Sequence, residues 1–103
     1  MSIIGTILQQ PGELLDYDID YTGFFSSSEG ILDDGISTIP GRCSVVVTPD
    51  YGVNCQLVRS SSRTLKIVLS NVAADVEFKI TVTMVSERNL IKEDELILVG
   101  IDF

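Results

Sequence analysis

The stretch that most constrains the fold is residues 14–21, where apolar and acidic side chains alternate. The alternating residues are Leu15, Asp16, Tyr17, Asp18, Ile19, Asp20 and Tyr21. A period of two places successive side chains on opposite faces of an extended chain. Asp is also a poor helix former. The stretch therefore predicts a strand with one apolar, aromatic face that needs cover and an opposite face that carries three carboxylates.

Other short segments repeat this pattern between turn signals such as Pro40-Gly41 and Pro49-Asp50-Tyr51-Gly52. The predicted strands span residues 14–21, 36–39, 43–48, 53–57, 64–70, 76–85 and 95–103. About seven short strands with turns between them are typical of an antiparallel sandwich. We predict an all-β, immunoglobulin-like antiparallel β-sandwich over residues 14–103. Its core would hold Tyr17, Ile19, Val45, Val47, Leu65, Ile67, Phe78, Ile80, Val82, Ile97, Val99 and Ile101.

Both ends of the chain are more apolar than a lone sandwich of this kind needs. Residues 1–13 are interrupted by Gly and Pro, so we predict an extended N-terminal arm; the alternative is an edge strand of the same domain. In the last strand, Leu96 and Leu98 would point outward, and a strand that is apolar on both faces needs cover on both. We predict that this cover comes either from contacts with other subunits or from the N-terminal arm lying on the last strand. The predicted interface residues are Ile3, Ile4, Ile7, Leu8, Asp16, Asp18, Asp20, Leu96, Leu98 and Phe103.

The charge of the chain is concentrated near its start. The net charge is −8 over 103 residues, and the first 41 residues contain seven acidic residues and no basic one. Nucleic-acid binding needs a cluster of basic residues, so it is disfavoured. No apolar run reaches the roughly 18 residues that cross a bilayer, so we expect no membrane partner. The acidic segment either serves solubility or docks on a basic partner surface.

The acidic and thiol groups do not form a recognisable catalytic or metal-binding pattern. Asp16-x-Asp18-x-Asp20 lacks the Gly and Glu of a calcium loop, and strand spacing holds the carboxylates apart. Asp33-Asp34 is read as a turn former rather than a glycosidase pair. The chain has no His that would activate a serine or cysteine. We predict no enzymatic activity, no cofactor and no metal site, and free thiols at both Cys43 and Cys55.

Two further clusters each have a structural and a functional interpretation. Arg59, Arg63 and Lys66 form the main basic cluster, which is either solvated or complementary to the acidic strand of another subunit. The aromatic residues Tyr17, Tyr21, Phe24, Phe25 and Tyr51 could form a sugar-binding platform, but core packing is the favoured interpretation.

The segment Leu15-Asp16-Tyr17-x-x-Asp20, followed by a serine-bearing turn and by the run from Leu65 to Glu87, resembles small immunoglobulin-like structural proteins of tailed bacteriophages. These are fibre–tail adaptors or head-decoration and cement proteins. The resemblance spans roughly residues 10–90. This chain has Tyr21 where such proteins commonly carry Trp, and it adds a further apolar strand at its end.

The resemblance implies an oligomeric virion component without enzymatic activity, made in the host cytoplasm. Its partners would be other virion proteins, such as capsid, connector or fibre subunits, and copies of itself. The alternative from another class is a carbohydrate- or calcium-dependent adhesion module.

Overall fold

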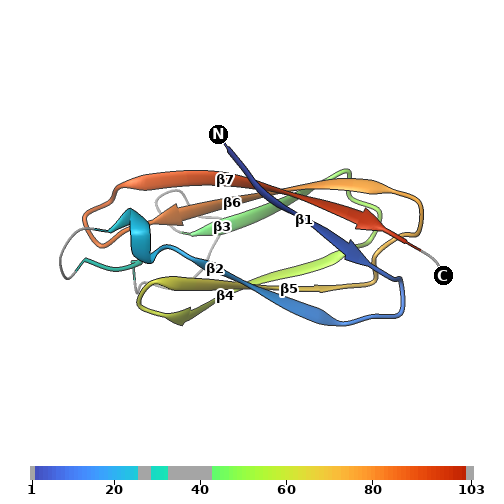
Figure 1. Ribbon diagram of the computed structural model, residues 1–103, viewed down its shortest axis with the longest axis horizontal. Helices are drawn as coiled ribbons and strands as arrows, with labels where there is room; N and C mark the ends of the chain where they lie inside the picture. Colours follow the sequence, from blue (N-terminus) through green and yellow to red (C-terminus); the bar gives the residue numbers. More distant parts are fainter. Residues whose placement is uncertain (1, 26–28, 33–42, 102–103) are drawn as a thin grey trace.

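Two β-sheets face each other in the computed structural model, which describes residues 2–25, 29–32 and 43–101, with side chains from Gly5 onward (Figure 1). One sheet has the strand order β1-β7-β6-β3 and the other has the order β2-β5-β4. The strands are β1 (Ser2–Gln9), β2 (Leu15–Asp20), β3 (Ser44–Thr48), β4 (Asn54–Ser61), β5 (Thr64–Ser70), β6 (Glu77–Val85) and β7 (Ile91–Gly100). A short 3-10 helix, η1 (Thr22–Phe24), follows β2.

This topology confirms the predicted immunoglobulin-like sandwich. The groups β2-β5-β4 and β3-β6-β7 have the arrangement of the B-E-D and C-F-G strands of that fold. The predicted strand at residues 36–39 lies outside the described residues. Among the described residues, no helix combines the length and apolar character that crossing a bilayer requires.

The core lies between the sheets and follows the predicted alternation in β2, β5 and β6. Of the predicted core residues, those that are buried are Ile19, Leu65, Ile67, Phe78, Ile80 and Val82. Tyr17, Val45 and Val47 are partly buried and pack against them. Strands with one polar face therefore have the orientation that their sequence predicts.

The predicted orientation of the last strand is wrong by one residue. Leu96 and Leu98 are buried, with exposed fractions of 7% and 0%, whereas Ile97, Val99 and Ile101 are only half-buried. The cause is the register with β6, in which Leu96 lies opposite Ile80 and Leu98 lies opposite Phe78. Directly opposed residues share one face of a sheet, so both leucines join the core. Their predicted outward position, on which their interface role depended, is corrected.

The N-terminal segment is an edge strand of the sandwich, the alternative that the sequence left open, and not a free arm. β1 pairs with β7 in parallel, so this sheet is not purely antiparallel, and Ile7 lies opposite Leu98. Gln9 at the end of β1 is fully buried. Its Nε2 donates to the carbonyl oxygens of Glu13 and Leu69, at 2.9 Å each. These bonds hold β1 over the opposite sheet.

Candidate functional site

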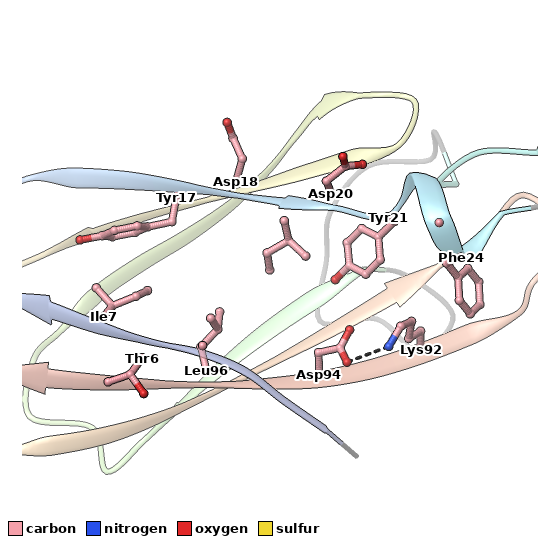
Figure 2. A pocket seen from close by; sticks show the side chains of 13 residues that line it. Thr6, Ile7, Tyr17, Asp18, Asp20, Tyr21, Phe24, Lys92, Asp94 and Leu96 are labelled. Carbon is pink, nitrogen blue, oxygen red and sulfur yellow. Dashed lines mark hydrogen bonds and ion pairs between the residues drawn. The ribbon is translucent and has the colours of Figure 1, made fainter.

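A groove of about 690 Å³ opens along the side of the sandwich where β1 and β2 form the edges of the two sheets. Its volume lies in the range of typical ligand pockets. Figure 2 shows side chains from both sheets that point into this space. The lining residues are Gly5, Thr6, Ile7, Tyr17, Asp18, Ile19, Asp20, Tyr21, Gly23, Phe24, Lys92, Asp94 and Leu96.

The groove is open because of the strand pairing. β1 pairs with β7, and β2 pairs with β5, so each is the last strand of its sheet on this side. In constant-type immunoglobulin sandwiches the first strand belongs to the sheet of the second strand. Here β1 lies entirely on the other sheet. Among the described strands, β2 therefore has a neighbour on one side only.

The floor of the groove is apolar. Ile7 of β1 and Ile19 of β2 are each 8% exposed, and Leu96 of β7 is 7% exposed. All three line the groove, and Figure 2 shows Ile7 and Leu96 pointing into the space between the sheets. They come from parts of the chain that are far apart in sequence, and only the pairing of β1 with β7 brings Ile7 next to Leu96 and Leu98.

The three carboxylates of β2 lie on its outer face, as the alternation predicts. Asp16, Asp18 and Asp20 are all exposed. Asp16 forms an ion pair of 3.6 Å with Lys66 on β5. Within the described residues, the Asp18 side chain has no hydrogen bond or ion pair.

Asp20 has a local structural role at the start of η1. Its Oδ1 accepts hydrogen bonds from the backbone N–H of Thr22 at 2.9 Å and from the Thr22 hydroxyl at 2.6 Å. The two bonds lower the pKa of the Asp20 carboxyl below its usual value, the side-chain bond most strongly.

One end of the groove holds a buried polar cluster. The Lys92 ammonium lies 2.8 Å from Oδ1 of Asp94, whose side chain is only 2% exposed. Tyr21 is 3% exposed, and its hydroxyl has no hydrogen-bond partner among the described residues. Figure 2 shows this hydroxyl directed between the sheets toward Asp94. Buried hydroxyls are normally paired, and the described residues supply no partner for this one.

The chemistry of this cluster suits binding rather than catalysis. Burial raises the pKa of Tyr21 far above its usual value, and the nearby charge of Asp94 and then Cys43 add to the effect. The phenol therefore stays protonated at neutral pH and can only exchange hydrogen bonds. Within the groove the Asp94 carboxylate is paired with the Lys92 ammonium, while Asp18 and Asp20 lie at the rim, on the outer face of β2 (Figure 2). Cationic groups of an occupant are therefore favoured at the rim, beside the outer face of β2.

Sequence reasoning did not find Lys92 and Asp94, because it assigned them to a charged connection before the last strand. β7 begins at Ile91 and includes both residues. The available signal was the alternation of Lys92 and Asp94, which continues the inward register of Leu96 and Leu98.

The other predicted interface residues are placed as follows. Ile7 is buried and lines the groove, whereas Leu8 is 59% exposed on the opposite side of β1. Ile3 and Ile4 belong to the β1 backbone, and their side chains lie outside the described part. Phe103 also lies outside the described residues, as do Asp33 and Asp34.

The members of the basic cluster are partly exposed and make contacts within the chain, and their predicted solvated or intersubunit role stays a prediction. The Arg59 guanidinium donates to the carbonyl oxygen of Ile31 at 3.3 Å, and that of Arg63 donates to the carbonyl of Glu29 at 3.2 Å. Arg63 also lies over the Phe25 ring, 5.6 Å from its centroid. Lys66 is paired with Asp16 at the surface, where such ion pairs add little stability.

The two thiols are free and lie in different sheets. Cys43 is buried directly before β3, and Cys55 belongs to β4. Burial raises the pKa of Cys55 to about 11, so this thiol is a poor nucleophile at neutral pH. The described residues hold no group of three or more acidic or thiol side chains placed to bind a metal ion.

No protein-family model and no curated protein matches the chain. Two chains of solved structures match. One is a 2,6-sialyltransferase of Vibrionaceae Photobacterium sp. JT-ISH-224, in a ternary complex with CMP and lactose, with 17% identity and a TM-score of 0.47. The alignment covers 98% of this chain and 17% of that chain. A likeness of this degree carries no argument about activity.

Proposed function

We propose that the chain is a non-enzymatic structural subunit of a tailed-bacteriophage virion that acts by binding neighbouring virion proteins. It would serve either as a cement or decoration protein that stabilises the capsid, or as an adaptor between tail and fibre. The virion assignment is supported by the resemblance carried by Leu15, Asp16, Tyr17 and Asp20 and by residues 65–87.

The observation that carries the binding role is the apolar groove between the two edge strands β1 and β2, beside the acidic outer face of β2. An exposed strand edge is a template for pairing with another chain. The groove beside it has an apolar floor at Ile7, Ile19 and Leu96. A surface of this kind supports association with protein, because apolar burial supplies affinity and the carboxylates supply orientation.

The charge supports the choice of partner. The outer face of β2 carries Asp16, Asp18 and Asp20, and such a face repels nucleic-acid phosphates and anionic lipid headgroups. Basic patches on capsid, connector or fibre subunits would be attracted. We include copies of the chain itself among the partners, through surfaces other than this acidic face, and we include no cofactor.

Deleting the gene from the virus that encodes the chain tests this proposal. Loss of the chain is expected to give particles that release their genome at a lower temperature if it is a cement protein. If it is an adaptor, the deletion is expected to give particles without fibres. Supplying the chain in trans should restore either property. Fully stable and fully assembled particles from the deletion would contradict the proposal, as would a calcium-dependent rise in melting temperature coupled to glycan binding.

A further inference from the structure

The edge of β2 offers space for one more strand. β2 pairs with β5 from Leu15 to Asp20, and no described strand lies on its other side. At a rise of about 3.3 Å per residue, an added segment of roughly six residues would cover β2 from end to end. Adding a strand to an open sheet edge is a recurrent way for proteins to bind extended peptides.

The groove beside this edge would receive one face of such a segment. An added strand directs alternate side chains inward and outward. The inward ones would lie over the floor of Ile7, Ile19 and Leu96, where apolar side chains are favoured. At the η1 end, a polar group of the segment would meet the buried Tyr21 hydroxyl, which lacks a partner among the described residues.

The outward side chains of the segment would lie beside the carboxylates of β2. Cross-strand neighbours of opposite charge stabilise a sheet, and like charges directly opposite each other destabilise it. Asp16 and Asp18 therefore select Lys or Arg at alternate positions. The same charges exclude a second copy of the N-terminal region of this chain, because its first 41 residues hold seven acidic residues and no basic one.

We propose that the edge of β2 and the adjoining groove accept an extended segment of another virion protein, in which basic and apolar residues alternate, as an added strand. This inference rests on the proposed function, which it deepens by giving the partner a sequence pattern. The acidic face would then have two effects, because it blocks pairing with other copies of the chain and admits a basic partner.

A blocked eight-residue peptide in which Lys alternates with Val tests the proposal against the ¹⁵N-labelled chain. Its two controls are a peptide of the same composition with all Lys before all Val, and a peptide with Glu in place of Lys. We expect only the alternating peptide to shift the amide resonances of β2, η1 and the Lys92–Leu96 region. Equal shifts from the block peptide, spread over the acidic surface, would overturn the proposal, as would the absence of any shift.

Matched variants separate strand addition from simple charge attraction. The double variant Asp16→Asn with Asp18→Asn is expected to bind the alternating peptide about tenfold more weakly at low salt. Glu77→Gln with Glu93→Gln removes the same charge from exposed positions of β6 and β7 and should have little effect. An equal loss in both double variants would contradict the assigned site. Asp20 stays unchanged because it holds Thr22 in place.

Tyr21→Phe isolates the buried hydroxyl. The free protein has no partner for this group among the described residues, so the variant should fold at least as stably as the wild type. The probe here is an alternating peptide in which Thr replaces the inward Val at the η1 end, and its binding should weaken about three- to tenfold, by the loss of one buried hydrogen bond. Unchanged binding would exclude the hydroxyl from the site.

The inference and the proposed function can fail separately. If the chain is present in purified particles but shows none of these peptide effects, the virion proposal stands and the proposal that β2 accepts an added strand is rejected. A chain that binds the alternating peptide at β2 but is absent from particles retains the acceptor groove and loses the virion assignment.

Discussion

The Nε2 atom of Gln9 lies 2.9 Å from the carbonyl oxygen of Leu69, 60 residues later in the chain. This bond joins the edge strand β1 of one sheet to β5 of the other. The Tyr17 hydroxyl, at 3.4 Å, donates to Oε1 of the same amide. Together with the parallel pairing of β1 with β7, the bond to Leu69 holds the apolar N-terminal segment on its own sandwich.

Replacing Gln9 by Leu should destabilise the protein by about 2 kcal/mol, because the carbonyl groups of Leu69 and Glu13 would lose their buried donor. Chemical denaturation would measure the change. Gln10→Ala is the control, since the Gln10 side chain makes no such bond between the sheets, and it should change stability by less than about 0.5 kcal/mol. Equal effects of the two variants would contradict the role of Gln9.

Gly100→Ala should strongly destabilise the fold. A methyl group at this position would overlap the backbone carbonyl of Ala73, and backbone atoms cannot move aside cheaply. Gly100 is also tied to the same turn through its N–H, which donates to the carbonyl of Val76 at 2.9 Å.

Gly12→Ala is the matched control for Gly100→Ala, because an added methyl group there meets no atom within 4 Å. Thermal unfolding of both variants would show the difference. A melting temperature of Gly100→Ala within a degree or two of the wild type would mean that the β7 end does not pack against the residue 72–76 turn as described.

The Lys92–Asp94 pair should matter more than an exposed pair on the same strand. Lys92→Met leaves a carboxylate that is 2% exposed without its ammonium, and because Lys92 is itself partly exposed we expect a loss of about 2 kcal/mol. Lys79→Met breaks a 3.4 Å pair with Glu95 at a half-exposed position and should cost less than about 1 kcal/mol. Urea denaturation of both variants would measure the two losses in free energy of unfolding. A larger loss for Lys79→Met than for Lys92→Met would contradict the prediction.

Stability should fall in alkaline solution, in part through Cys55. Burial raises the pKa of this thiol from 9.0 to about 11, so the folded state keeps a proton that the unfolded state releases. The contribution of the protonated Cys55 thiol to the free energy of unfolding is therefore fully present below pH 9, and it is lost as the pH rises through 11. Because the thiol is partly exposed, solvent reduces the effect, and we expect a loss of about 1–2 kcal/mol from this group.

Cys55→Ala should remove this part of the alkaline loss while leaving the loss from buried Tyr21, whose pKa is also raised. Unfolding free energies measured between pH 8 and pH 11 for both proteins test the assignment. Parallel curves for wild type and variant would show that Cys55 does not titrate in this range.

The sequence was sufficient to predict β2 and β6, since each has one polar face that sets its orientation. It was insufficient for β7, because its central residues are all apolar. With no alternation between polar and apolar side chains, the sequence does not show which face of the strand points into the core. These residues are Leu96, Ile97, Leu98 and Val99. The orientation there depends on the opposition of Leu96 to Ile80, which is a long-range contact.

The groove could not be predicted for a related reason. It depends on β1 pairing with β7, which brings Ile7 and Leu96 together from opposite ends of the chain. Tyr21 was correctly predicted to face the core. That its hydroxyl lacks a partner among the described residues depends on the exact packing around Asp94 and cannot be read from a pattern.

The central claim is that the chain is a structural subunit of a virus particle, and its copy number in purified particles tests this most directly. Quantitative mass spectrometry against the major capsid protein is expected to give a fixed stoichiometry: hundreds of copies for a shell component, or six to a few dozen for a tail or connector component. A chain that is absent from particles, or that varies in amount from one preparation to the next, would contradict the claim.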